Sequence, residues 1–200
     1  MHHDTYAVIY SDPPWDVHAW QKNKKGERPK SYYPTMKPRE LEAMPVWELN
    51  EPDGTHHFMW TVSSRLDQAV DLLRSWGYAK ISVAFSWLKV TGQDANGAYI
   101  LQMGMGNVTR FGMEVVLHAY SGKKSDPPNM EDVMQVVPAP VGEHSAKPEE
   151  IRQRITELYP FEPRLEMFAR NVWDGWDAFG NDVDKAVPQP QAMRSQRRSS

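Results

Sequence analysis

Short apolar runs typical of β-strands alternate with stretches of helical periodicity along this chain, and this alternation restricts its fold more than any other feature. Runs rich in β-branched and aromatic residues predict strands at residues 6–10, 57–62, 78–88, 114–120 and 164–169. Apolar residues at helical spacing predict helices over 66–76, capped by Ser63 or Ser64, and from Pro148 to about 158, with a short one at 39–43. This alternation favours an open α/β sheet that binds its ligand at the carboxyl ends of strands.

Length and cysteine content narrow the functional classes. The 200 residues suit one compact domain, which we place at residues 1–184, followed by a basic tail at 185–200 that is expected to be disordered. The chain has no Cys, which excludes thiol nucleophiles and Cys-bound metal, and its His residues show no ligand spacing, so no metal site is expected. There is neither a membrane-spanning apolar run nor a signal peptide, which predicts a soluble, cytoplasmic protein with no membrane partner.

The net charge of −3 conceals an uneven distribution. The tail carries four basic residues and no acidic one, which leaves 19 bases against 26 acids, a net charge of −7, in residues 1–184. A second basic group lies at residues 22–30, where the only acidic residue is Glu27 and the basic residues are Lys22, Lys24, Lys25, Arg28 and Lys30. Such a group is either a nucleic-acid contact or an ordinary solvated loop, and charge alone does not separate the two.

The most unusual segment is Asp12-Pro13-Pro14-Trp15, just after the first predicted strand. Each of these residues alone is common in turns, so a simple turn is the alternative interpretation. Together they form a rigid array with an acceptor carboxylate, an aromatic plane and stiffly aimed carbonyls, of which at least one is expected to lack a partner within the fold. Two acceptors on the hydrogens of an aromatic amine would favour its attack on an electrophile. The array therefore predicts alkylation of a nucleobase amine.

Further motifs follow in order along the chain. They lie at residues 33–36 (YPTM), 59–62 (MWTV), 76–78 (WGY), 104–110 (GMGNVTR), 143–149 (EHSAKPE), 166–170 (EMFAR) and 175–181. With Asp12-Pro13-Pro14-Trp15, this set resembles the DPPW adenine-N6 methyltransferases, a family that includes the catalytic subunit of the eukaryotic messenger-RNA adenosine methyltransferase and bacterial and phage DNA enzymes. The resemblance covers about residues 6–182.

The resemblance implies a Rossmann-like α/β fold, an open mixed sheet with helices on both faces and a permuted order of motifs, and S-adenosylmethionine as cofactor. Asp12 and the Pro13 carbonyl would bind the target amine, with Pro14 and Trp15 shaping the base pocket. Lys147 would contact the methionine carboxylate of the cofactor, unless it is an exposed lysine before a helix. The remaining cofactor contacts would be Arg170, Asn171, Asn181 and Asp182, although a plain Gly-Asn turn explains Asn181 equally well. The chain begins only a few residues before its first predicted strand, so the upstream segment that holds the cofactor adenine in longer relatives is expected to be missing or rebuilt.

Adenine in DNA is the favoured target, either flipped out of a duplex or single-stranded. The basic group and the glycine-rich loop are expected to form a clamp through Lys22, Lys24, Lys25, Asn107 and Arg110, with Tyr33 stacking on bases unless it is a core aromatic. A small chain resembles the bacterial and phage DNA enzymes more than the RNA group. Adenosine methylation in RNA and a non-catalytic nucleic-acid-binding subunit are the alternatives. Target recognition is expected to involve a homodimer or a partner subunit.

Overall fold

A computed structural model describes residues 4–15, 35–106, 108–122, 130–142 and 146–180. The strands are β1 (Val8–Ser11), β2 (Gly54–Thr61), β3 (Ala79–Gln93), β4 (Tyr99–Leu101), β5 (Met113–Gly122), β6 (Val136–Pro140), β7 (Arg164–Met167) and β8 (Asp177–Phe179). The helices are α1 (Pro38–Glu42), α2 (Leu66–Ser75) and α3 (Glu149–Leu158), together with the 3-10 turns η1 (Val46–Leu49), η2 (Ser63–Arg65) and η3 (Met130–Asp132).

The strands form one mixed, open sheet in the order β4-β3-β5-β2-β1-β7-β8, with β6 also paired to β3. At its centre β1 runs parallel to both β2 and β7, and β8 continues parallel to β7. The strand β5 is antiparallel to both β2 and β3. The carboxyl ends of β1, β2, β7 and β8 therefore meet the amino end of β5 at one edge of the sheet.

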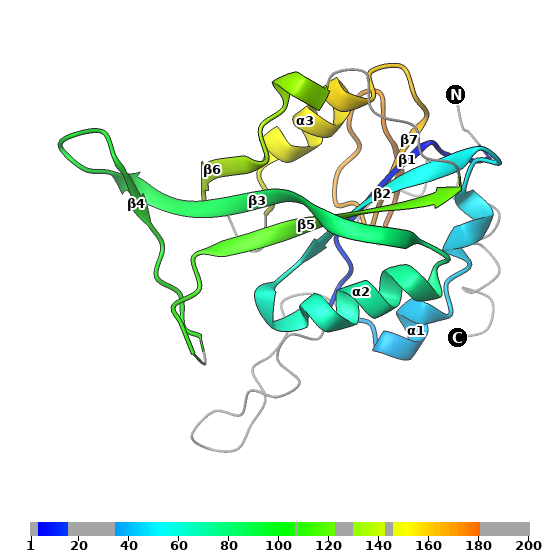
Figure 1. Ribbon diagram of the computed structural model, residues 1–200, viewed down its shortest axis with the longest axis horizontal. Helices are drawn as coiled ribbons and strands as arrows, with labels where there is room; N and C mark the ends of the chain where they lie inside the picture. Colours follow the sequence, from blue (N-terminus) through cyan, green and yellow to red (C-terminus); the bar gives the residue numbers. More distant parts are fainter. Residues whose placement is uncertain (1–3, 16–34, 107, 123–129, 143–145, 181–200) are drawn as a thin grey trace.

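Helices cover both faces of the sheet (Figure 1). On one face, α1, α2 and η1 pack against a core cluster that includes Ile9, Met59 and Leu117 from the central strands. On the other face, α3 supplies Ile151 and Ile155 to a second cluster. Because successive residues of a strand point to opposite faces, the central strands contribute to both clusters and are buried along their length.

A hairpin extends from one end of the sheet, where β3 continues past its pairing with β5 and turns back as β4 (Figure 1). Asp94 closes the turn, because its Oδ1 accepts the backbone N–H groups of Asn96 at 2.8 Å and Ala98 at 2.9 Å. After β4 the chain makes a further loop, in which Gly104 and Phe111 exchange backbone hydrogen bonds. We call residues 91–112 the arm.

The structure confirms the predicted alternation as a mixed α/β sheet with few helices, but it corrects several details. Neither Ser63 nor Ser64 caps α2, since both lie in η2 and the cap position is Arg65, which makes no side-chain cap bond. Pro148 is the residue before α3 rather than its first residue. Three short strands were not predicted from the sequence: β4, β6 and β8. The tail lies outside the described residues.

Candidate active site

The site is built around Asp12, the first residue after β1. Because β1 lies between β2 and β7, its end is surrounded by the carboxyl ends of neighbouring parallel strands. The Asp12 side chain is about one third exposed, at 32%. It can therefore accept a bond from a ligand at the sheet edge, where open α/β sheets bind their ligands.

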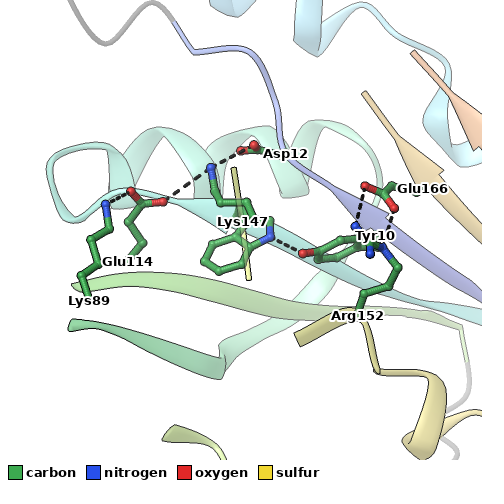
Figure 2. Close-up of polar contacts among 8 residues, drawn as sticks. Tyr10, Asp12, Lys89, Glu114, Lys147, Arg152 and Glu166 are labelled. Carbon is green, nitrogen blue, oxygen red and sulfur yellow. Dashed lines mark hydrogen bonds and ion pairs between the residues drawn. The ribbon is translucent and has the colours of Figure 1, made fainter. Parts of the chain in front are cut away.

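Lys147 reaches Asp12 from the segment that leads into α3. Its Nζ donates to Oδ2 of Asp12 at 2.9 Å, across 135 residues of sequence (Figure 2). The ammonium also lies 5.3 Å from the centroid of the Trp60 ring, a cation–π distance. Two residues assigned from the sequence to different ligands, an amine for Asp12 and a carboxylate for Lys147, are thus in direct contact.

Glu114 extends this contact into a network of four charges. It lies at the amino end of β5, with Oε1 2.5 Å from Nζ of Lys89 and Oε2 3.5 Å from Nζ of Lys147 (Figure 2). Positive and negative groups alternate along the row Lys89, Glu114, Lys147 and Asp12, and their formal charges cancel. The network holds Lys147 between two carboxylates, which fixes the ammonium at the sheet edge.

A second polar cluster is linked to this network through the Trp60 ring, which lies against Lys147. The indole Nε1 of Trp60 donates to the hydroxyl of Tyr10 at 2.5 Å. The Arg152 guanidinium lies 6.0 Å from the Tyr10 ring centroid and 4.0 Å from that of Trp173, and its Nε donates to Glu166 at 2.7 Å. Burial raises the pKa of Tyr10 and of Glu166, and the adjacent guanidinium opposes the shift at Glu166. These contacts join β1 to β2, and α3 to β1 and β7.

The backbone of the Asp12-Pro13-Pro14-Trp15 segment is a tight turn. The Pro13 carbonyl accepts the Trp15 N–H at 2.8 Å, and the Pro14 carbonyl accepts the Met36 N–H at 3.0 Å. The expected unpartnered carbonyl is therefore not one of these two, although each oxygen keeps a second lone pair. Trp15 is buried at 7% exposure in the core cluster, and its indole N–H has no hydrogen-bond partner among the described residues.

The other predicted site residues divide into two groups. Arg170 and Asn171 are exposed just beyond β7, at the same edge of the sheet as Asp12, and Arg110 is exposed in the arm. Among the described residues that the sequence predicts for the site, Lys147 is the one with a side-chain hydrogen bond to Asp12. The second group lies outside the described residues and comprises Lys22, Lys24, Lys25, Tyr33, Asn107, Asn181 and Asp182.

Sequence reasoning missed Glu114, Lys89 and Arg152 as members of the site. Glu114 and Lys89 were detectable as charged residues at the ends of predicted strands, next to apolar runs. The signal for Arg152 was weaker, because it was only a positively charged residue on the predicted helix that carries Ile151 and Ile155. Their assignment required knowledge of which strand ends share an edge, which depends on the order and direction of the strands.

Among the described residues, no cluster of three or more His, Asp or Glu side chains could hold a metal ion. No helix within these residues is long and apolar enough to cross a membrane. Lys147, Asp12 and the exposed polar residues after β7 supply a different set of groups: an ammonium for a carboxylate, and a carboxylate for an amine. Lys147 therefore fits a cofactor that carries a carboxylate, such as S-adenosylmethionine, and Asp12 fits a substrate that carries an amine.

Comparison with known proteins assigns the family. The MT-A70 family model matches residues 6–182. The Type II methyltransferase M.MunI of Mycoplasma sp. is 31% identical over 89% of this chain and 78% of its own length. The human N(6)-adenosine-methyltransferase catalytic subunit METTL3 is 29% identical over 90% of this chain and 28% of its own length. The Drosophila melanogaster N(6)-adenosine-methyltransferase MT-A70-like protein is 31% identical over 90% of this chain and 27% of its own length. The chain thus spans about a quarter of these two eukaryotic relatives. The match over most of the chain, with the Asp12 motif at the edge of the sheet, shows that this protein belongs to the MT-A70 family of adenine N6-methyltransferases.

Proposed function

We propose that this chain transfers a methyl group from S-adenosylmethionine to the exocyclic amine of adenine in DNA, on a Rossmann-like fold with a permuted order of motifs. The observation that carries the proposal is the pairing of Asp12, at the end of the central strand, with Lys147 at 2.9 Å. It gives one site both an acceptor for an amine and a cation for a carboxylate. DNA is preferred as the target because the chain covers 78% of the Type II methyltransferase M.MunI but only 28% of the N(6)-adenosine-methyltransferase catalytic subunit METTL3.

The cofactor would be held by Lys147 through its methionine carboxylate, with Arg170 and Asn171 beside the end of β7 available to its polar groups. Asn181 and Asp182, which would complete the cofactor contacts, follow Gly180 at the end of β8. When bound, the cofactor supplies a methyl group on a positively charged sulfur, so no metal is required for its activation. Holding both reactants in line accounts for much of the rate of such a transfer.

Asp12 has the central role toward the target base. Its carboxylate accepts one hydrogen of the adenine amine, and the second lone pair of the Pro13 carbonyl is the candidate acceptor for the other. Both contacts would stabilise the positive charge that grows on the nitrogen as it bonds to the methyl carbon, while the carbon–sulfur bond breaks and leaves a neutral thioether. The amine proton then leaves through an Asp12 oxygen to solvent. The Trp15 ring forms part of the wall beside this turn.

Nucleic acid would contact the rim of the site. Arg110 is exposed in the arm, and Lys22, Lys24 and Lys25 carry the basic charge expected to face phosphates. Asn107 and Tyr33 are the proposed base contacts in this clamp. Replacing the three lysines with Gln should weaken DNA binding and flatten its dependence on salt concentration. Binding unchanged at low salt would exclude the clamp.

The test of function is incubation of the purified chain with labelled S-adenosylmethionine and either DNA or RNA, followed by nucleoside mass spectrometry. We expect N6-methyladenine in DNA. Asp12→Ala should lower the transfer rate by roughly a factor of 10³, while cofactor affinity measured by calorimetry changes only a few-fold. The matched control is Asp71→Asn, an exposed carboxylate on α2, which should leave activity unchanged.

Three outcomes would contradict the proposal in different ways. Label in RNA alone would transfer the assignment to adenosine methylation of RNA. Cofactor and DNA binding without any transfer would identify a nucleic-acid-binding subunit. Full activity of Asp12→Ala would remove the role assigned to this carboxylate.

A further inference from the structure

Ser11, the last residue of β1, makes a buried side-chain hydrogen bond that is not part of the ion network. Its Oγ lies 2.8 Å from Nε2 of His57 in β2, and both residues are fully buried, at 0% exposure. Ser11 immediately precedes Asp12. The bond therefore ties the central strand to its neighbour at the residue before the proposed amine acceptor.

The turn that follows Ser11 is poor in backbone anchors. Pro13 and Pro14 carry no N–H, so two successive donors are missing from the turn that begins at Asp12. The Pro13 carbonyl accepts the Trp15 N–H at 2.8 Å, a bond that closes the turn but does not tie it to a neighbouring strand. The orientation of the turn relative to the sheet therefore depends strongly on how Ser11 is held.

His57 is suited to hold Ser11 because its ring is fixed and uncharged. The ring stacks on that of Trp76, with centroids 5.4 Å apart, and meets Tyr78 edge to face at 4.8 Å. Burial, with a smaller effect from His118, lowers the pKa of His57 to about 3, so the imidazole is neutral at pH 7. Its Nδ1 has no hydrogen-bond partner among the described residues, so the contact with Ser11 is the hydrogen bond of this ring within that part of the chain.

Ser11 and Asp12 are held from opposite faces of the sheet. Ser11 lies on the face of Ile9 and of the cluster under α1 and α2, because alternate residues of a strand share a face. Asp12 is paired with Lys147, whose ammonium lies against Trp60 in the cluster on the α3 face. A ligand carboxylate that takes over Lys147 would leave the Ser11 bond to keep the strand end in place.

We propose that His57 is a positioning residue for methyl transfer, which acts through the Ser11 hydroxyl to hold the Asp12 carboxylate and the Pro13 carbonyl in the orientation that accepts the target amine. This inference rests on the proposed function, because it assigns a role within that reaction. A misplacement of about 1 Å costs roughly 100-fold in rate. Loss of one anchor loosens the turn without removing an acceptor, so it should cost about 10-fold.

Two variants remove the bond from either side. Ser11→Ala deletes the hydroxyl, and His57→Phe deletes the nitrogen while it keeps an aromatic ring against Trp76 and Tyr78. Each should lower kcat for methyl transfer to DNA by about 10-fold, while the Kd of S-adenosylmethionine changes by less than about 2-fold. The double variant should lose no more than either single variant, because both remove the same bond. His57→Gln, whose amide can donate to Ser11, should recover most of kcat.

The matched control is Thr55→Val, near the other end of the same two strands. The buried Thr55 hydroxyl donates to the Tyr6 carbonyl at 2.6 Å. Its loss should lower the urea midpoint of unfolding as Ser11→Ala does, yet leave kcat unchanged. A control that loses as much kcat as Ser11→Ala would overturn the proposal, as would full kcat in both Ser11→Ala and His57→Phe or additive losses in the double variant.

Amide hydrogen exchange at Trp15 gives a readout that does not depend on activity. Its N–H closes the turn, so Ser11→Ala and His57→Phe should speed its exchange by about 10-fold relative to Thr55→Val. Equal exchange in all three variants would overturn the positioning role. A wild-type chain without transfer activity would refute the proposed function instead, and faster exchange in the two variants would still support the anchoring of the turn by His57.

Discussion

Replacing Glu114 with Gln probes the ion network, because this carboxylate bridges two ammonium groups. Its oxygens lie 2.5 Å from Nζ of Lys89 and 3.5 Å from Nζ of Lys147, and the three side chains are only 13–21% exposed. Gln keeps the size of the side chain and removes its charge. Lys89 then loses its carboxylate partner in this network, whereas Lys147 keeps Asp12.

The magnitude follows from distance and burial. At an effective dielectric constant of about 20, each contact is worth about 5–7 kcal/mol of Coulomb attraction, and desolvation offsets most of it. Removing one partner of a fully buried pair costs about 3–5 kcal/mol, against about 0–1 kcal/mol for an exposed pair. Because the network is partly exposed and Lys147 keeps Asp12, we expect the free energy of unfolding to fall by about 2–3 kcal/mol, and Tm by roughly 5–10 °C.

Urea unfolding followed by tryptophan fluorescence measures this loss. The control is Asp71→Asn, which removes the same charge from the Asp71–Arg74 pair, whose side chains are about 70% exposed at 72% and 67%. The control should lose less than about 0.5 kcal/mol. If Glu114→Gln costs no more than the control, the network contributes nothing to stability, and the argument for a fixed Lys147 is wrong.

Three further predictions concern the stability of the fold. Both Trp15→Phe and Trp76→Phe remove part of a buried ring, but only Trp76 donates its indole N–H, to the Leu41 carbonyl at 2.8 Å, whereas the Trp15 N–H has no partner among the described residues. Trp76→Phe should therefore lower the free energy of unfolding by about 1 kcal/mol more than Trp15→Phe, which chemical denaturation measures. Gly54→Ala should lower the free energy of unfolding by more than about 3 kcal/mol, because the φ of Gly54 is +125° and a Cβ would lie 2.1 Å from a backbone oxygen. Gly97 has a φ of +82° but open space around it, so Gly97→Ala should lower the same free energy by only about 1 kcal/mol. Burial lowers the pKa of His57 from 6.5 to about 3, so between these pH values the unfolded chain binds a proton that the folded chain does not. The contribution of His57 to the free energy of unfolding should be fully present above pH 6.5 and should fall by about 2 kcal/mol at pH 5. A His57→Gln variant that loses just as much stability on acidification would contradict this prediction.

The sequence predicted the central strands well because they are buried on both faces. β1 and β2 are continuous apolar or aromatic runs, which leave few alternatives. The peripheral strands lack this signal. β4 and β8 have only three residues each, and β6 contains Pro138 and Pro140, which a strand tolerates only at an edge or a terminus.

The candidate site was predictable to the extent that it depends on single residues. Asp12 follows a buried strand, so its place at a sheet edge could be inferred from the chain alone. Glu114 could not be placed in this way, because β5 is antiparallel to its neighbours and brings its amino end, rather than its carboxyl end, to the same edge. The direction of a strand within a sheet is set by long-range pairing, which local periodicity does not record.

The contact between Asp12 and Lys147 constrains how the proposed reaction can proceed. An ammonium donates a stronger, charge-assisted hydrogen bond to a carboxylate than a neutral aromatic amine does. An adenine amine therefore competes poorly for the Asp12 oxygen that Lys147 occupies at 2.9 Å. A ligand carboxylate at Lys147 offers the ammonium another anion, in addition to Glu114 at 3.5 Å, and so releases Asp12 for the base. Under the proposed function, the pair makes amine binding at this one Asp12 oxygen depend on a carboxylate already bound at Lys147.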